Sequence, residues 1–373
     1  MRKPVNPFIV TGYHSPVYFC DRTDELSWLR EQFVNERNTV LYSWRRMGKT
    51  SLVKHFFHYL KKEKQADCIF VDLLGTTNLS EANRSIAEAI VRQLGNISKG
   101  IGQRLLKMLG TVGATLGVDP LSGAPQVTFG LVQNQSVPTS LEAIGGFLAE
   151  RKTPVIICID EFQQVVNYPE KQAEATFRTW TQNYPMVRFI FLGSQRHMMT
   201  SMFSEKNRPF YRSAQMRQLD PLPENEYTKF IKALFRKNGK SIESPHIDLI
   251  FKWTRKQTYY VQLVCNKVFG KTDLVEVKTI EDVFTEVIQQ EIPLFSFYQR
   301  LLSKIQWKLL VAISKEEDVA NPFGQTFLKQ HELGASSSVN TALQYLIKNE
   351  LVVHHNQKYT LHDTLLMRWL QQI

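Results

Sequence analysis

The fold is decided by the stretch Ser43-Trp44-Arg45-Arg46-Met47-Gly48-Lys49-Thr50. It follows the apolar residues 40–42 and precedes an amphipathic segment, residues 51–60, so it predicts a loop between the end of a strand and the start of a helix. A loop in this place directs several backbone N–H groups, and the positive end of the helix dipole, at one point. The sequence therefore predicts a phosphate-binding loop.

Individual residues of this loop have separate expected roles. Lys49 is expected to contact the β- and γ-phosphates, and Thr50 to give its hydroxyl to Mg²⁺. Ser43 stands where the pattern G-x-x-x-x-G-K-[ST] has its first glycine, so we expect the start of the loop to differ slightly. The alternative for Gly48-Lys49-Thr50 is a surface loop before a helix. The other residues expected around the phosphates are Arg45, Arg46, Met47, Gly48 and Ser51.

A second segment supplies the acidic residues of a nucleotide site. Residues 155–159 are five consecutive apolar residues, which is typical of a strand buried on both faces of a parallel sheet. Asp160 and Glu161 follow at its carboxyl end, where open α/β sheets place their chemistry. We expect Asp160 to hold Mg²⁺ through water and Glu161 to orient and deprotonate the attacking water. The alternative is that Asp160 caps the following helix and Glu161 is a solvated residue of its first turn.

A third predicted strand, residues 188–192, ends at Gly193-Ser194-Gln195. Ser194 is the candidate sensor of the phosphate state, and Gln195 is the second choice. Residues 68–72 and 215–219 are also strand-like, and helical stretches separate all these segments. This order predicts the α/β fold class, with a doubly wound parallel sheet.

Together these segments resemble a known family. The stretches around Phe19, Lys49, Asp160, Ser194 and Tyr260 look like the archaeal-type predicted ATPases, in the AAA+/STAND branch of P-loop NTPases. The resemblance implies a P-loop NTPase core, a helical lid, a C-terminal winged-helix domain, and ATP or ADP with Mg²⁺ as cofactors. It also implies that Phe19 and Arg22 line the nucleotide base.

The resemblance further implies an arginine presented to the γ-phosphate of a neighbouring subunit from the region before the last core strand. Arg212 is the first choice and Arg208 the second. The alternative is that both are solvated or pair with Glu205.

Helix breaks and turn signals along the sequence predict the domain organisation. We expect the ATPase core in residues 1–222, a lid in 223–292 and the winged helix in 293–373, with helices near 295–313, 324–331 and 336–348 and a hairpin turning at Asn356-Gln357. The serines at 336–338 could contact DNA or simply cap the third helix. Glycine-rich residues 95–138 predict an insertion, with an exposed strand at 126–132, that either contacts a partner or is a flexible excursion.

Composition limits the classes of protein to which the chain can belong. Its 373 residues are 43% hydrophobic, enough for two or three cores. No stretch of 18 apolar residues or signal-peptide core occurs, so we expect a cytoplasmic protein with no membrane contact. The four cysteines lack metal-binding spacing and are expected to be reduced core thiols.

The distribution of charge along the chain favours some candidate functions over others. The net charge is +11, but residues 293–373 hold eight basic and six acidic residues, which is weak for a DNA-binding module. We expect a Mg²⁺-dependent ATP-binding protein that hydrolyses ATP and acts as a conformational switch or motor, with an unidentified protein partner and homo-oligomerisation as further expectations. Two alternatives stay open: a DNA-binding ATPase that uses its winged helix, and a nucleotide-stabilised scaffold with negligible turnover.

Overall fold

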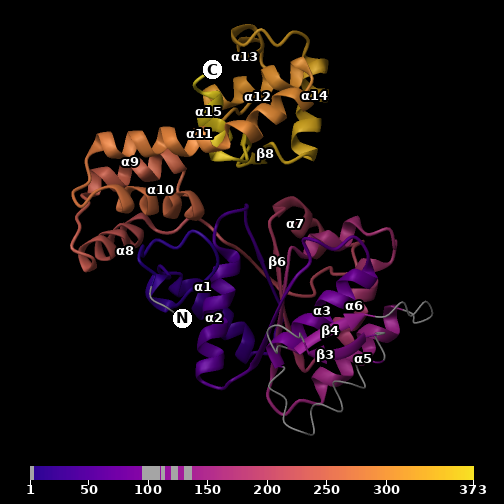
Figure 1. Cartoon of the computed structure of the whole chain (residues 1–373). Coiled ribbons are helices and arrows are strands. Elements are labelled where there is room, and N and C mark those ends of the chain that lie inside the picture. Colours follow the sequence, from indigo (N-terminus) through magenta and orange to yellow (C-terminus); the bar gives the residue numbers. More distant parts are fainter. Residues whose placement is uncertain (1–3, 95–109, 111–113, 119–124, 130–136) are drawn as a thin grey trace. The chain divides into compact units, whose positions relative to one another are not determined.

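The computed structural model describes residues 4–94, 110, 114–118, 125–129 and 137–373 (Figure 1). The chain forms two compact units. One is Thr11–Asp220, and the other consists of residues 4–10 together with Pro221–Ile373. Each unit is described by itself below.

The first unit is an α/β core. Its elements are the short helix η1 (Pro16–Tyr18), α1 (Thr23–Val34), β1 (Thr39–Tyr42), α2 (Lys49–Lys62), β2 (Asp67–Asp72), α3 (Leu79–Leu94), β3 (Ala114–Val118), β4 (Pro125–Phe129), α5 (Val137–Ala149), β5 (Val155–Asp160), η2 (Phe162–Asn167), α6 (Ala173–Asn183), β6 (Val187–Gly193), α7 (Arg196–Ser204) and β7 (Gln215–Gln218).

Five of these strands form one parallel sheet in the order β2-β5-β6-β1-β7. β1 and β2 follow each other in the chain, yet β5 and β6 lie between them. The connection after β1 crosses the sheet in one direction, to β2, whereas the connection after β6 runs in the other, to β7. The neighbouring strands β1 and β6 therefore form a switch point, and in open parallel sheets ligands bind at such a point, beyond the carboxyl ends of the strands. The register aligns Tyr42 at the end of β1 with Gly193 at the end of β6.

Both faces of the sheet are buried, which explains the unbroken apolar runs. Ile156 and Cys158 of β5 pack with α1 and α2, whereas Ile157 and Ile159 pack with α3, α5, α6 and α7 on the opposite face. All six residues of β5 and all seven of β6 are buried. The predicted doubly wound parallel sheet is confirmed.

Part of the expected insertion can be described. β3 and β4 pair as an antiparallel hairpin apart from the main sheet. The strand expected at 126–132 corresponds to β4, Pro125–Phe129, and residues 130–132 lie outside the described part of the chain. The remainder of the expected insertion, apart from residue 110, β3 and the start of α5, also lies outside it.

The second unit is helical and ends in a hairpin and a short helix. Its elements are α8 (Glu224–Lys237), α9 (Ser244–Thr254), α10 (Thr258–Lys271), α11 (Val277–Leu301), α12 (Lys304–Glu316), α13 (Gln325–Gln330), α14 (Ser336–Lys348), β8 (Val352–His355), β9 (Lys358–Leu361) and α15 (Thr364–Leu370). Asn356 and Gln357 both have positive φ between β8 and β9, as a two-residue hairpin turn requires, so the predicted hairpin is confirmed.

The amino-terminal segment packs in this second unit. Phe8 is buried between Phe235 of α8 and Phe269 of α10, and the Asn6 side chain donates to the Asn266 carbonyl over 2.7 Å. Residues 4–10 therefore belong to the second unit, whereas the sequence predicted that residues 1–222 form the core. Apolar burial of Phe8 explains the difference, because α8 and α10 offer it an aromatic pocket.

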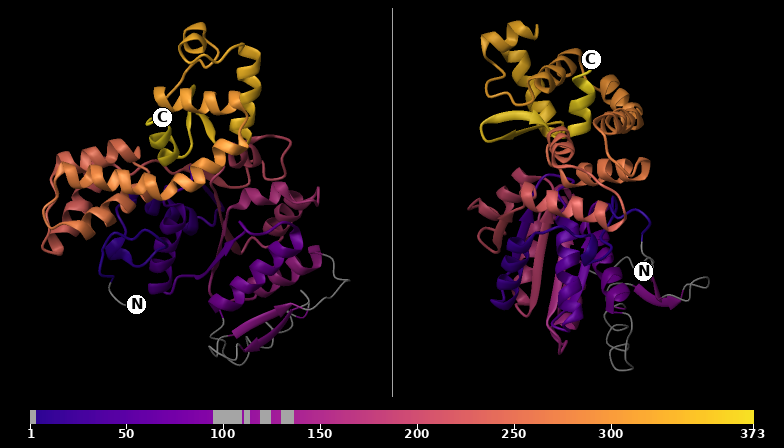
Figure 2. Two further views of the ribbon diagram at one scale, coloured as in Figure 1. Left: turned by 45° about the horizontal axis from the view of Figure 1, so that its top comes forward. Right: turned by 90° about the vertical axis from the view of Figure 1, so that its left-hand side faces the viewer.

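The expectation of one helix over residues 295–313 is wrong. α11 continues from Val277 through Pro293 to Leu301 as one long helix (Figure 2, orange), and α12 begins only after Ser303, which forms a capping box with Gln306. A proline inside a helix leaves the carbonyl four residues earlier, here that of Gln289, without its usual donor. Gln289 and Pro293 are both exposed, so water can satisfy that carbonyl.

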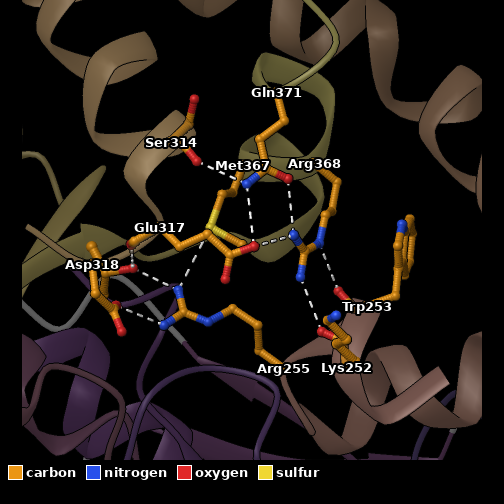
Figure 3. Close-up of polar contacts among 10 residues, drawn as sticks. Lys252, Trp253, Arg255, Ser314, Glu317, Asp318, Met367, Arg368 and Gln371 are labelled. Atoms are coloured by element: carbon orange, nitrogen blue, oxygen red, sulfur yellow. Dashed lines mark hydrogen bonds and ion pairs between the residues drawn. The ribbon is translucent and has the colours of Figure 1, made fainter. Parts of the chain in front are cut away.

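A polar network joins α9 to residues 317–371 of the same unit (Figure 3). Arg368 of α15 donates to the carbonyls of Lys252 and Trp253 on α9, both over 2.9 Å, and forms an ion pair with Glu317 at 2.6 Å. Arg255, at the end of α9, forms an ion pair with Asp318 at 3.0 Å. Residues 223–292 and 293–373, expected as a lid and a winged helix, lie in this one compact unit.

Two further expectations concern the whole chain. All four cysteines are buried and none forms a disulfide bond, as expected of reduced core thiols. Within the described residues, no helix combines the length and apolar character that a membrane span needs.

Candidate nucleotide-binding site

The predicted phosphate loop leads from β1 to α2. Ser43 does not have a positive φ, so it replaces the first glycine of the pattern without backbone strain. Positive φ occurs instead at Arg46 (69°) and Gly48 (91°), and Gly48 directly precedes the first residue of α2. These two left-handed residues bend the loop over the start of α2, which is the arrangement that aims backbone N–H groups inward.

Lys49 is buried inside this loop. Its ammonium donates to the Ser43 carbonyl at 3.2 Å, to the Ser43 hydroxyl at 3.3 Å and to the Trp44 carbonyl at 3.1 Å. Burial lowers the pKa of Lys49 to about 8, against the opposing effect of the carboxylates of Glu161 and Asp160. Loop oxygens thus hold a desolvated cation in the place where phosphate oxygens would be favourable ligands.

Thr50 and Asp160 meet at the carboxyl edge of the sheet. The Thr50 hydroxyl donates to Asp160 Oδ2 over 2.7 Å, and the Glu161 backbone N–H donates to Oδ1 over 3.0 Å. Burial raises the pKa of Asp160 to about 6, although the Thr50 hydrogen bond opposes this shift. A hydroxyl and a buried carboxylate side by side are oxygen donors of the kind that Mg²⁺ prefers, so these residues fit the expected ion.

Glu161 and Ser194 are also brought together. Glu161 has a left-handed backbone, with φ of 54°, just before η2, and its Oε2 accepts a hydrogen bond of 2.7 Å from the Ser194 hydroxyl. β5 and β6 are neighbours in the sheet, so the ends of both strands reach the same place. Neither Asp160 nor Glu161 caps a helix through its side chain.

Gln163 is a site residue to which the sequence assigned no role. Its buried side-chain amide donates to Glu161 Oε2 and, over 3.4 Å, to the Ser194 hydroxyl. Gly193 makes room for it, because a Cβ at Gly193 would lie 2.7 Å from Gln163 Oε1 and closer still to Met199. Gln163 occurs in the segment that carries the family resemblance, but only the fold shows that it contacts the acidic residue.

The residues expected at the nucleotide base lie in two different settings. Phe19 stacks on His55 of α2 with ring centroids 3.9 Å apart, and His55 Nδ1 lies 3.0 Å from the Tyr13 hydroxyl. Arg22 is buried, has a positive φ and bonds to the Asp220 carbonyl over 2.7 Å and to the Met47 carbonyl over 3.4 Å. Arg22 thus braces the phosphate loop against the chain that follows β7.

The two arginines considered for a neighbouring subunit differ in their contacts. Arg208 pairs with Glu174 of α6 at 2.8 Å, and not with Glu205. Arg212 is exposed, has a positive φ and lies over the ring of Tyr211, with 5.3 Å between the guanidinium carbon and the ring centroid. Of the two, Arg212 is therefore the one presented at the surface. Gln195, the second candidate sensor, directly precedes α7.

Comparison with family models identifies the chain. Residues 19–264 match the model of an ATPase domain predominantly from Archaea, and residues 293–372 match that of a probable winged helix domain. The chain belongs to this archaeal ATPase family. The resemblance inferred from the sequence is confirmed, and so is a P-loop NTPase core with a C-terminal winged helix.

Solved structures show the same fold at low sequence identity. The Walker-type ATPase PABY2304 of Pyrococcus abyssi is 16% identical, with a TM-score of 0.68 over 98% of this chain and 100% of that chain. The ORC2 protein of Aeropyrum pernix, in ADPNP–ADP complexes, is 15% identical, with a TM-score of 0.61 over 98% and 95% of the two chains. The ORC1 protein of the same organism, in complex with DNA, is 13% identical, with a TM-score of 0.56 over 99% and 96%. No curated protein sequence matches this ATPase.

Proposed function

We propose that this ATPase binds ATP with Mg²⁺ and hydrolyses it to ADP and phosphate. The observation that carries the proposal is the meeting of Lys49, Thr50, Asp160, Glu161 and Ser194 at one edge of the sheet, from three separate strands. Each of these side chains has the chemistry that phosphoryl transfer needs in that place.

Binding depends first on Lys49. In the loop its ammonium is held by neutral oxygens, and a triphosphate would offer charged ones in their place. With a pKa of about 8, Lys49 is mostly protonated at pH 7, and nearby phosphate charges would favour the charged form further. Thr50 and Asp160 would hold Mg²⁺, which supplies neutralisation of charge on the β- and γ-phosphate oxygens.

Hydrolysis depends on Glu161. Ser194 and Gln163 both donate to the same oxygen of its carboxylate, Oε2. That arrangement fixes the orientation of the carboxylate, so that its second oxygen can accept a proton from an attacking water. Ser194 would report the presence of the γ-phosphate by exchanging its hydrogen bond to Glu161 for one to a phosphate oxygen.

We further propose a conformational role for the hydrolysis. Arg368 and Arg255 fasten the lid helices to the winged helix, so both would respond to nucleotide as one body. The exposed Arg212 would complete the site of a neighbouring copy, since stabilising charge on the γ-phosphate is a common task of an arginine supplied by another subunit. Phe19 and its stack on His55 would contribute to the base end of the site.

A DNA-binding ATPase is the second candidate, because one solved relative of the same fold is a protein in complex with DNA. The surface of α14 argues against it here. Its exposed side chains are Ser336, Ser337, Ser338, Asn340, Thr341, Gln344, Tyr345 and Lys348. One cation on this helix and Lys358 on the hairpin would give a log–log salt dependence of only about −1.8, whereas stable DNA complexes need many more phosphate contacts. We therefore propose a protein-facing role for the winged helix.

One experiment separates these functions. Phosphate release is measured with the full chain, with and without duplex DNA, and the molecular size is measured in ADP and in a non-hydrolysable ATP analogue. Turnover that DNA does not change, with a size or compactness that depends on nucleotide, supports the conformational ATPase. Turnover that DNA stimulates, with a steep salt dependence, supports the second candidate. Tight ADP retention without phosphate release would show a scaffold and contradict the proposed hydrolysis.

A further inference from the structure

A chain of side-chain contacts runs from the phosphate loop to the last residue of the core unit. Its first member is Lys49, whose ammonium holds the Trp44 carbonyl at 3.1 Å. The Trp44 ring lies under the guanidinium of Arg196, at the start of α7, with 5.4 Å between the guanidinium carbon and the ring centroid. This distance is within the range of an attractive cation–π contact.

Arg196 also contacts β7, which extends the series of contacts. One of its Nη groups donates to Gln218 Oε1, and Gln218 in turn donates to the Asp220 carboxylate. Asp220 is the last residue of the core unit, and Pro221 is the first residue of the second unit beyond this boundary. Arg196 thus links the Trp44 end of the phosphate loop to the end of the core.

Partial burial of the charged Arg196 guanidinium costs desolvation free energy. Arg196 is half-buried, and burial lowers its pKa, while the nearby Tyr42 and Asp220 side chains oppose that shift. Among the described residues it forms no ion pair with a carboxylate, although Asp220 lies close enough to affect its pKa. A side chain that served only to fill space would not need to carry this charge.

A second arm reaches the same end point. Arg22 bonds to the carbonyls of Met47, in the phosphate loop, and of Asp220. The two arms hold different parts of the loop, at Trp44 and at Met47, and both finish at Asp220. A shift of the loop would therefore be transmitted to one residue from two directions.

We propose that Arg196 is a positioning residue that couples phosphate binding at Lys49 to Asp220, and so to the chain that leads into the lid. When phosphate draws the Lys49 ammonium away, the Trp44 carbonyl loses its donor and the Trp44 ring can shift. Arg196 then moves with the Trp44 ring, and its hydrogen bond to Gln218 transmits this displacement to Gln218 and Asp220. This inference rests on the proposed function, because it requires a phosphate-bearing nucleotide in the loop.

The test compares two arginine–tryptophan pairs of the same unit. Arg196→Met removes the guanidinium of the proposed chain. Arg217→Met is the matched control, because Arg217 of β7 lies over Trp28 at 5.7 Å and donates to the Asp24 carbonyl, and both of these partners belong to α1. Hydrogen exchange of the Leu219, Asp220 and Leu222 amides is measured with and without a non-hydrolysable ATP analogue and Mg²⁺, beside the affinity for the analogue.

In the unaltered protein and in Arg217→Met we expect the analogue to change exchange at these amides by about fivefold or more, the lower end of typical coupling between sites. In Arg196→Met we expect the analogue to bind within about threefold of normal affinity and the change in exchange to fall to less than about half, because only the Arg22 arm still connects the loop to Asp220. Should Arg196→Met fail to fold, Gln218→Leu breaks the same chain one residue further on and has the same expected result.

Each other outcome overturns a stated claim. If Arg196→Met keeps the nucleotide-dependent change, or if Arg217→Met loses it equally, Arg196 is not the coupling residue, while the proposed ATP binding stands. If the unaltered protein does not bind the analogue at all, the proposed function fails and the inference fails with it.

Discussion

The Thr50 hydroxyl and Asp160 Oδ2 lie 2.7 Å apart, although 110 residues separate them in the chain. Thr50 is the second residue of α2, which follows β1, and Asp160 is the last residue of β5, two strands away from β1 in the sheet. Their contact joins the phosphate loop to the acidic segment at the carboxyl edge of the sheet.

Replacing Lys49 should remove nucleotide binding. Lys49→Ala deletes a buried cation, and losing such a charge-assisted contact costs about 2 to 5 kcal/mol, roughly 30-fold or more in affinity. Calorimetric titration with an ATP analogue and Mg²⁺ measures the effect. Lys54→Ala is the control, because Lys54 lies on the same helix but over the Phe70 ring and outside the loop. Normal affinity in Lys49→Ala would show that the site is elsewhere.

Replacing Glu161 should separate binding from hydrolysis. Glu161→Gln keeps the shape of the side chain and a hydrogen-bonding oxygen for Ser194, but it removes the base. We expect binding within a few-fold of normal and hydrolysis slowed by about 10²-fold or more. Asp72→Asn is the control, since Asp72 lies beside Asp160 in the sheet register, and single-turnover phosphate release is the measurement. Unchanged turnover in Glu161→Gln would assign the base to another group.

Acid should destabilise the core through His55. Burial lowers the pKa of His55 to about 4, against an ordinary value of 6.5, so the unfolded chain takes up a proton that the folded core excludes. Stability present above pH 6.5 is therefore lost as the pH falls toward 4. A shift of this size corresponds to about 3 kcal/mol.

Denaturant unfolding at pH 7 and at pH 4.5 checks this effect. His55→Phe keeps an aromatic ring against Phe19 but cannot be protonated, so it should lose less stability between the two pH values than the unaltered protein does. His197→Gln, at an exposed position on α7 of the same unit, should behave like the unaltered protein. Equal pH dependence in His55→Phe would show that other groups cause the loss.

Arg212 should act on a neighbouring copy. Subunits carrying Arg212→Ala and subunits carrying Glu161→Gln are each expected to hydrolyse ATP poorly, because each lacks one part of a composite site. Mixing them should restore some activity, since sites form that combine an intact Glu161 with an intact Arg212. Phosphate release across a series of mixing ratios is the measurement. A protein that stays monomeric in every nucleotide state rules this role out.

The junction of lid and winged helix should depend on Arg368. Arg368→Met leaves the Lys252 and Trp253 carbonyls and the Glu317 carboxylate without this donor. We expect a loss of about 2 kcal/mol or more, with increased proteolysis near α11. Lys308→Met is the control, because the Lys308–Glu332 pair is exposed and should contribute little. If cleavage and stability are unchanged in Arg368→Met, the two parts are held by apolar packing alone.

Local sequence was sufficient for the strands, the phosphate loop and the hairpin. The apolar run of residues 155–159 marks a doubly buried strand because both faces of β5 are covered, and the turn at Asn356-Gln357 follows from the backbone that a short hairpin requires. The site residues at the ends of β1, β5 and β6 were also predictable, because parallel strands bring their carboxyl ends to one edge.

The sequence by itself therefore determined the family, the parallel sheet and the residues that the sheet edge brings together. Only the tertiary structure decided that α11 passes through Pro293, that Phe8 packs with α8 and α10, and that Gln163, Arg22 and Arg196 contact the site. Periodicity and motif spacing report on neighbours along one element. Contacts among Gln163, Glu161 and Ser194, or between Arg196 and Trp44, depend on which loops the folded sheet places side by side, and no local pattern encodes that distance.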